Sequence, residues 1–199
     1  MKLITAVMVT GKPRGVEGLP QMAVECFLNQ TYENKELLIL NHGSENFSGK
    51  NIRDVKIQKG ENEHIGALRN RAFALAQGEL ICVWDDDDCS SPERMTWQAE
   101  RTPDGKMSML ENIFAKNLLT GETITRHSRV GFGATMLYPR STPDRYENWV
   151  RGSDGWFRSC YLNKIHLDNP PELYTYNFHG GNLTPLAEII KKELILPPR

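Results

Sequence analysis

The 199-residue sequence lacks an excess of charge of either sign, and it lacks long apolar runs. Its 24 Lys and Arg residues oppose 25 Asp and Glu residues, so the formal net charge is −1. Because no field of one sign dominates, unspecific binding to a phosphate backbone is disfavoured, and we expect no nucleic-acid partner. No apolar run reaches the ~18 residues that a transmembrane helix requires, so we expect no transmembrane segment.

Several familiar motifs are missing as well. There is no Gly-x-x-x-x-Gly-Lys-[Ser/Thr] loop, and the glycines of residues 11–18 lack the Gly-x-Gly-x-x-Gly spacing, which disfavours P-loop ATPases and NAD-binding proteins. The cysteines Cys26, Cys82, Cys89 and Cys160 form no Cys-x-x-Cys pair. Two of them lie inside apolar runs, which is typical of reduced thiols, and no signal-peptide cleavage pattern follows the apolar N-terminus. We therefore expect a cytoplasmic protein.

Apolar runs alternate with helical patterns in the first half of the chain. The expected strands cover residues 3–9, 36–40, 55–57 and 80–84, and the expected helices cover residues 20–28, 65–75 and 91–101. Strands that are separated by helices favour a parallel sheet with helices on both faces.

The second half has a different pattern. Thr120-Gly121 indicates a hairpin between two strands, and the expected elements there are strands over residues 107–119, 122–126 and 134–138 and helices over residues 153–162 and 185–194. We therefore expect one α/β domain over residues 1–199, with a mainly parallel central sheet flanked by helices and a smaller antiparallel part in the C-terminal half.

Polar loops follow three of the expected parallel strands. They begin at Thr10, at Asn41 and at Asp85. Ligands of open parallel sheets bind at the carboxyl ends of the strands, so we expect these loops to form one cleft.

The strongest feature is a run of four aspartates at residues 85–88, directly after an apolar strand. Adjacent carboxylates repel one another unless a cation compensates for their charge. On an extended chain, Asp85 and Asp87 would point to one side and Asp86 and Asp88 to the other, so that one pair could hold Mg²⁺ or Mn²⁺. Such cations bind together with phosphates, which favours a nucleoside diphosphate ligand. A solvated acidic loop is the alternative.

Several motifs in the first half resemble family 2 glycosyltransferases. Residues 27–36 read FLNQTYENKE, residues 65–72 include Arg69-Asn70, residues 76–81 read AQGELI, and the aspartates follow Trp84 as a DXD motif. Together these motifs extend over about residues 3–95 in the order that the family has. The resemblance implies the GT-A fold, a nucleotide-sugar donor and a Mn²⁺ or Mg²⁺ cofactor.

The resemblance also implies roles for single residues. The candidates for nucleotide-sugar binding are Thr10, Asn41, His42, Arg69, Asp85 and Asp86. Asp87 matches the carboxylate that binds the metal. Asn41-His42 stands where the family usually has two aspartates, and both side chains can donate or accept a hydrogen bond. The residues therefore do not determine which nucleobase is bound, and a UDP-sugar is favoured only because the family that the sequence resembles commonly uses one.

Two candidates lie in the second half. Asp154 resembles the catalytic base of the family, although Ser153 precedes it in place of a glutamate, and His179 resembles a histidine that approaches the metal. Simpler alternatives are a helix-terminal acid for Asp154, a loop residue for His179 and a surface position for Arg69.

The expected protein is a metal-dependent, inverting glycosyltransferase. About residues 1–102 would bind the nucleotide sugar, and about residues 103–199 would face the acceptor. The alternatives are a sugar-phosphate nucleotidyltransferase and a non-catalytic nucleotide-sugar-binding module of the same fold. The acceptor, which could be a glycan, a lipid-linked molecule or a protein, stays open.

Overall fold

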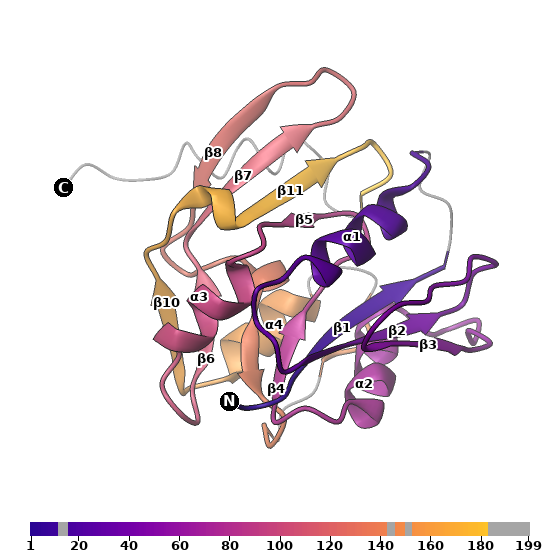
Figure 1. The fold of residues 1–199 in the computed structure, drawn as a ribbon, viewed down its shortest axis with the longest axis horizontal. Helices are drawn as coiled ribbons and strands as arrows, with labels where there is room; N and C mark the ends of the chain where they lie inside the picture. The colour runs from indigo at the N-terminus through magenta and orange to yellow at the C-terminus, as the bar shows by residue number, and fades with distance from the viewer. Residues whose placement is uncertain (12–15, 143–145, 150–152, 183–199) are drawn as a thin grey trace.

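The computed structural model describes residues 1–11, 16–142, 146–149 and 153–182 (Figure 1). The strands are β1 (Ile4–Thr10), β2 (Lys35–Asn41), β3 (Ile52–Lys56), β4 (Leu80–Val83), β5 (Cys89–Ser90), β6 (Met107–Leu110), β7 (Asn112–Asn117), β8 (Thr123–His127), β9 (Leu137–Pro139), β10 (Lys164–Leu167) and β11 (Tyr174–Phe178). The helices are α1 (Leu19–Leu28), α2 (Ile65–Leu75), α3 (Arg94–Arg101) and α4 (Ser153–Cys160), with 3₁₀ turns η1 (Gly133–Thr135) and η2 (Pro171–Leu173). The helix expected over residues 185–194 lies outside the described residues.

The central sheet has seven strands in the order β10-β6-β9-β4-β1-β2-β3. Its first four strands along the chain, β1 to β4, run parallel, and β9 is antiparallel to both of its neighbours. The register pairs Thr10 with Asn41 and Val7 with Val83, so three strands end at one edge of the sheet. The predicted parallel arrangement of the first half is confirmed.

Helices cover both faces of this sheet, which explains why its strands read as unbroken apolar runs. Leu37 and Ile39 pack in a cluster with Phe27 of α1, whereas Leu38 and Leu40 pack with Leu68 of α2. All seven residues of β1 are buried. Alternate side chains of one strand therefore enter two separate halves of the core.

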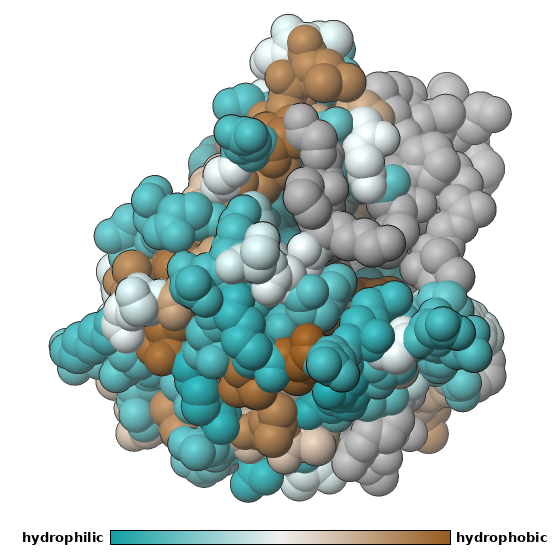
Figure 2. Space-filling model, turned by 90° about the vertical axis from the view of Figure 1, so that its right-hand side faces the viewer, coloured by the Kyte–Doolittle hydropathy of each residue, from teal (hydrophilic) through white to brown (hydrophobic). Residues whose placement is uncertain are grey.

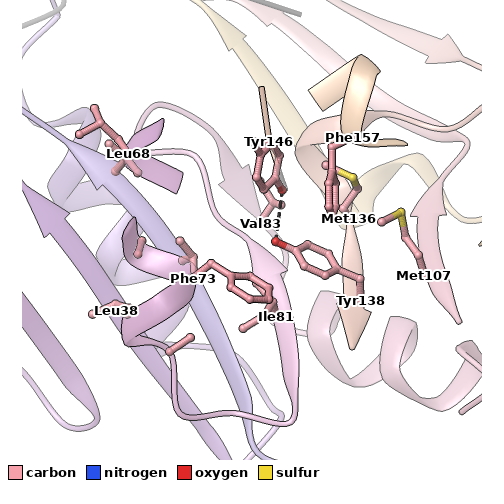
Figure 3. Packing of buried hydrophobic residues seen from close by; sticks show 14 of the residues in the cluster. Leu38, Leu68, Phe73, Ile81, Val83, Met107, Met136, Tyr138, Tyr146 and Phe157 are labelled. Carbon is pink, nitrogen blue, oxygen red and sulfur yellow. Dashed lines mark hydrogen bonds between the residues drawn. The ribbon is translucent and has the colours of Figure 1, made fainter. Parts of the chain in front are cut away.

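The α2 side of the core holds an aromatic cluster of Tyr138, Tyr146 and Phe157 (Figure 3). Phe157 belongs to α4, and its ring centroid lies 5.0 Å from that of Tyr138 and 4.4 Å from that of Tyr146. The two tyrosine hydroxyls are 3.3 Å apart. Because large buried rings dominate packing energies, this cluster holds α4 against the sheet.

A second sheet has four strands in the order β5-β11-β7-β8. The predicted hairpin is confirmed as β7 and β8, but residues 107–119 are not one strand, since β6 joins the central sheet and β7 the second sheet. The change occurs at Glu111, where Asn169 Oδ1 accepts the N–H groups of Glu111 (2.9 Å) and Asn112 (3.0 Å). A distant side chain thus satisfies the backbone where the chain leaves the first sheet.

The predicted fold class is confirmed: a mainly parallel central sheet with helices and a smaller sheet that carries an antiparallel hairpin. The two expected halves share the central sheet, because β6, β9 and β10 extend it beyond β4. On the face shown in Figure 2, hydrophilic residues predominate and hydrophobic residues form small separate patches. In the part of the chain that the structure describes, no helix has the length and apolar character to cross a bilayer.

Candidate active site

The carboxyl ends of β1, β2 and β4 open into one cleft of about 510 Å³. Thr10, Asn41, Asp86 and Asp87 line it, together with the first residues of α1 from Leu19. The prediction that the polar strand ends share a cleft is confirmed. The parallel register explains this, because neighbouring parallel strands place their carboxyl ends at the same edge of the sheet.

The aspartate run does not alternate as predicted. The strand pleat ends at Val83, and the chain turns at Asp86 and Asp87, so these neighbours both line the cleft. The expected division, with Asp85 and Asp87 on one side and Asp86 and Asp88 on the other, is therefore wrong, because it requires an extended backbone. A solvated loop is excluded too, since Asp86, Asp87 and Asp88 are 3%, 5% and 3% exposed.

One side of the run, which we call the arginine side, consists of Arg69, Asp85 and Asp154. Arg69 Nη2 donates to Asp85 Oδ1 at 2.6 Å, and Nη1 donates to Asp154 Oδ1 of α4. Burial alone would lower the pKa of the Arg69 guanidinium, but the two carboxylates outweigh it and raise that pKa. Arg69 is only 7% exposed, so the alternative of a surface arginine is wrong.

The aromatic cluster of Tyr138, Tyr146 and Phe157 packs against the arginine side. The Arg69 guanidinium lies 5.6 Å from the ring centroid of Tyr146, within the range of a cation–π contact. Phe157, on the same helix as Asp154, packs against that tyrosine. The packing of the second half thereby places Asp154 beside the aspartate run.

Burial raises the pKa of Asp85, and the nearby Asp87 and Asp154 act in the same direction. The Arg69 guanidinium opposes these effects and lowers the pKa. The arginine side therefore joins two carboxylates to one guanidinium, with Asp87 close enough to add to the negative potential at Asp85.

The opposite side, which we call the β11 side, consists of Asp87, Asp88, Tyr174, Asn177 and His179. His179 Nε2 lies 3.2 Å from Asp87 Oδ2. Asp88 accepts the Tyr174 hydroxyl at 2.5 Å and the Asn177 backbone N–H at 2.8 Å, while Asn177 Nδ2 donates to the Asp87 carbonyl at 2.9 Å. The predicted neighbourhood of Asp87 and His179 is thus present, and hydrogen bonds from β11 hold the neighbouring Asp88.

Sequence reasoning missed Tyr174, Asn177 and Asp88 as site residues. Asn177 lies in the segment that resembles the family's histidine motif, which was the only signal pointing to it. Burial raises the pKa of Asp88 well above its usual range, and Asp87 and Asp85 add to this effect. The inward-facing Asp88 therefore joins β11 to the aspartate run and does not face the cleft as a ligand.

Asp87 and His179 are the pair best placed to hold a cation. A carboxylate oxygen and an imidazole nitrogen together suit Mn²⁺, whereas Mg²⁺ prefers oxygen ligands. Across the described residues, no three His, Cys, Asp or Glu side chains gather into a closed metal site. A cation here would keep open positions for a ligand.

The Asn41 side chain has a fixed orientation. Its Nδ2 donates to the Glu45 carbonyl at 2.9 Å and to Asp54 Oδ1 at 3.0 Å, and its Oδ1 accepts the Gly43 N–H at 2.9 Å. Both amide hydrogens are thereby used within the protein, so only the oxygen retains hydrogen-bonding capacity. Sequence reasoning missed Asp54, which fixes this orientation.

His42 occupies a different place from its neighbour. Its backbone N–H donates to the Thr10 carbonyl at 3.0 Å. Its ring lies on Gly11, where a Cβ atom would come within 2.0 Å of the imidazole. Gly11 is therefore required for the close approach of the two loops that edge the cleft.

Comparisons with known proteins find related sequences and related folds. The family model described as "Glycosyl transferase family 2" matches residues 21–148. A protein of Bacillus subtilis (strain 168), whose name assigns it as the glycosyltransferase EpsH, is 31% identical over 108 residues. That match covers 51% of this chain and 31% of the relative, so the chain spans about a third of the length of that relative.

Solved structures share the fold at low sequence identity. S. aureus TarS 1-349 in complex with UDP-GlcNAc matches with a TM-score of 0.70 and 14% identity, over 90% of this chain and 60% of the TarS chain. The mannosyltransferase PcManGT from Pyrobaculum calidifontis, in complex with GDP-Man and Mn²⁺, matches with a TM-score of 0.63 and 10% identity, over 87% of this chain and 56% of its own. The fold is thus of the GT-A type. Since the family model matches more than half of the sequence, the chain belongs to glycosyl transferase family 2.

Proposed function

We propose that this chain transfers a sugar from a nucleoside-diphosphate sugar to an acceptor hydroxyl, with a divalent cation and with inversion at the anomeric carbon. The observation that carries the proposal is the position of Arg69, which joins Asp85, directly before the cleft residues Asp86 and Asp87, to Asp154 of the second half. A donor site and a candidate base thereby meet across one guanidinium. Family membership supports the reaction class.

For the donor, we propose a UDP-sugar. Asn41 lines the cleft, and its side-chain oxygen, which accepts the Gly43 N–H, has a second lone pair that could accept the imide N–H of uracil. The structure of TarS with UDP-GlcNAc supports this choice for a protein of the same fold. Guanine also carries a ring N–H donor, so GDP belongs in the test.

Asp87 and His179 would hold Mn²⁺ or Mg²⁺, and the donor's diphosphate would occupy the open positions. When bound, the cation neutralises the negative charge of the departing nucleoside diphosphate. Of the remaining candidates, Thr10 and Asp86 line the same cleft, where they would contact the nucleotide sugar, and His42 would act through the loop that it packs on at Gly11.

Asp154 would act as the general base. It takes the proton of the acceptor hydroxyl while the oxygen attacks the anomeric carbon, and the bond to the diphosphate breaks on the opposite face. Arg69 Nη1 donates a hydrogen bond that holds the Asp154 carboxylate in place, and Phe157 packs the same helix, α4, against the sheet. Positioning of this kind contributes a large part of catalysis in bimolecular transfer.

The test measures nucleotide binding and sugar transfer in Asp87→Ala and Asp154→Asn, with Asp104→Asn as a control at an exposed carboxylate. We expect both site variants to lose transfer, and only Asp87→Ala to lose metal-dependent UDP binding. Loss of UDP affinity in Asp154→Asn with transfer intact would overturn the base assignment. Pyrophosphate release from a nucleoside triphosphate and a sugar phosphate would instead identify a nucleotidyltransferase.

We also infer a single domain over residues 1–199, with a donor half of about residues 1–102 and an acceptor half of about residues 103–199. The continuous central sheet supports this division within one unit. We propose a cytoplasmic location, supported by four free cysteines. Fractionation of cells that express the full-length protein tests the location.

A further inference from the structure

Two cysteines from distant parts of the chain lie together behind the aspartate run. Cys26 belongs to α1 and Cys89 to β5, which packs beside that helix (Figure 1). The two thiols share a hydrogen bond, and both are partly exposed. Cys89 Sγ also lies 3.2 Å from the sulfur of Met22, one helical turn before Cys26 on the same face of α1. Sulfur atoms therefore take part in the contact between the helix and the strand.

Of the two thiols, Cys26 has the surroundings of a nucleophile. The hydrogen bond from Cys89 outweighs burial, and with the Ser90 N–H it lowers the pKa of the Cys26 thiol to about 6, although the Glu25 carboxylate acts in the opposite direction. The thiolate is the reactive form of cysteine. Cys82 has the contrary environment, because full burial raises its pKa.

We propose that Cys26 and Cys89 are a modification site that hydrogen peroxide converts into a reversible disulfide. The Cys26 thiolate attacks one peroxide oxygen, the O–O bond breaks, and a sulfenic acid and, after protonation, one water result. The Cys89 sulfur then attacks the Cys26 sulfur, the S–O bond breaks, and the hydroxyl leaves with the Cys89 proton as a second water. Two thiols are oxidised by two electrons, and one molecule of hydrogen peroxide is reduced.

The disulfide would connect two segments that border the cleft. α1 begins with Leu19 and Pro20, which line the cleft, and β5 directly follows the aspartates. Asn177 Nδ2 contacts both the Cys89 sulfur, at 3.6 Å, and the Asp87 carbonyl, at 2.9 Å. Oxidation of Cys89 therefore changes the surroundings of Asn177, which positions Asp87. We expect the disulfide to weaken nucleotide binding for this reason. This second consequence rests on the proposed function.

The first experiment treats the reduced full chain with one equivalent of hydrogen peroxide, in the presence of a chelator, in a Cys160→Ser background that removes the exposed thiol. We expect the intact mass to fall by two hydrogens, a cross-linked Cys26–Cys89 peptide in the non-reduced digest, and recovery of both thiols with dithiothreitol. A cross-link to Cys82, or stable sulfinic acid at Cys26 without a cross-link, would overturn the proposal.

Two variants separate the roles of the thiols without relying on the cross-link. Cys89→Ser should stop at the sulfenic acid of Cys26, which dimedone traps, whereas Cys26→Ser should leave Cys89 unoxidised. In the unoxidised protein, alkylation of Cys26 should reach half of its maximal rate near pH 6, compared with about pH 8.5 for thiols of the unfolded chain. A rate for Cys26 that still rises steeply above pH 8 contradicts its role as the nucleophile.

The link to the cleft is measured as UDP affinity with Mn²⁺ before and after oxidation, once the peroxide has been removed. We expect a loss of about fivefold or more, the lower end of typical couplings between sites. Unchanged affinity in the disulfide form would overturn that link. Failure of the reduced protein to bind any nucleotide would count against the proposed function and leave the thiol chemistry intact.

Discussion

The aspartate run is held on its two sides by different chemistry. On the arginine side, one buried guanidinium pairs with two carboxylates from opposite halves of the chain. On the β11 side, a phenol hydroxyl and a backbone N–H hold Asp88. The first arrangement compensates the negative charges with a cation. The second satisfies the hydrogen bonds of Asp88 but supplies no cation, so burial favours the uncharged form of its carboxyl group.

This difference is visible in how each carboxyl group responds to burial. Burial raises the pKa of both Asp85 and Asp88, but only for Asp85 does a guanidinium oppose the shift. Two buried acids of one run therefore have unlike requirements: Asp85 needs its negative charge for the ion pair, and Asp88 needs its oxygen atoms as acceptors. Substitutions that remove charge but keep shape separate the two.

The largest effect is expected for Arg69→Met, which leaves Asp85 and Asp154 facing each other without the cation between them. Breaking a buried ion pair from one side costs about 3 kcal/mol of unfolding free energy. The matched control is Arg71→Met on the same helix, where the arginine side chain is 39% exposed against 9% for Arg69 and its pair with Glu63 contributes at most ~1 kcal/mol. Equal losses for the two variants in urea unfolding would contradict the compensating role of Arg69.

A smaller difference in unfolding free energy is expected between Asp85→Asn and Asp88→Asn, the same substitution at the two ends of the aspartate run. Asp85→Asn loses a charged hydrogen bond to Arg69 and should destabilise the protein by about 2 kcal/mol. Asp88→Asn keeps an oxygen for the Asn177 N–H, but its amide N–H can only donate to the Tyr174 hydroxyl, whose hydrogen loses its acceptor, so the variant should lose about 1 kcal/mol, less than Asp85→Asn. Thermal and urea unfolding measure both. A larger loss in Asp88→Asn would show that its charge is needed.

The cleft was largely predictable from the sequence, and the pairing of β11 was not. Strands β1 to β4 and helices α1 and α2 follow local apolar patterns, so the cleft residues Thr10, Asn41 and Asp87 could be placed from strand ends. β11 is a five-residue strand with a mixed burial pattern, and it pairs with β7, far away in the sequence. No local pattern carries such a pairing.

The burial of a charged side chain in α3 was also not predicted from the sequence. Arg94 of α3 is fully buried, lies 4.8 Å from the Tyr174 ring and 5.3 Å from the Trp84 ring, and donates to Ser90 Oγ at 2.9 Å. An arginine on a helix rich in polar residues is expected at the surface. Its burial depends on these two aromatic rings and on hydrogen bonds to Ser90 and to two backbone carbonyls, which cannot be read from spacing along the chain.

The smallest effect tests whether the hydrogen bonds of the β11 side position the site or only stabilise the fold. Tyr174→Phe removes the hydroxyl that Asp88 accepts, and Tyr32→Phe removes a hydroxyl that donates to the Lys2 carbonyl at 2.7 Å, next to the start of β1. Each should cost about 1 kcal/mol of unfolding free energy. Only Tyr174→Phe should also weaken UDP binding in the presence of Mn²⁺, because it loosens the strand that leads to His179. If both variants bind UDP like the wild type, the β11 side serves stability alone, and the positioning of Asp87 depends on the arginine side.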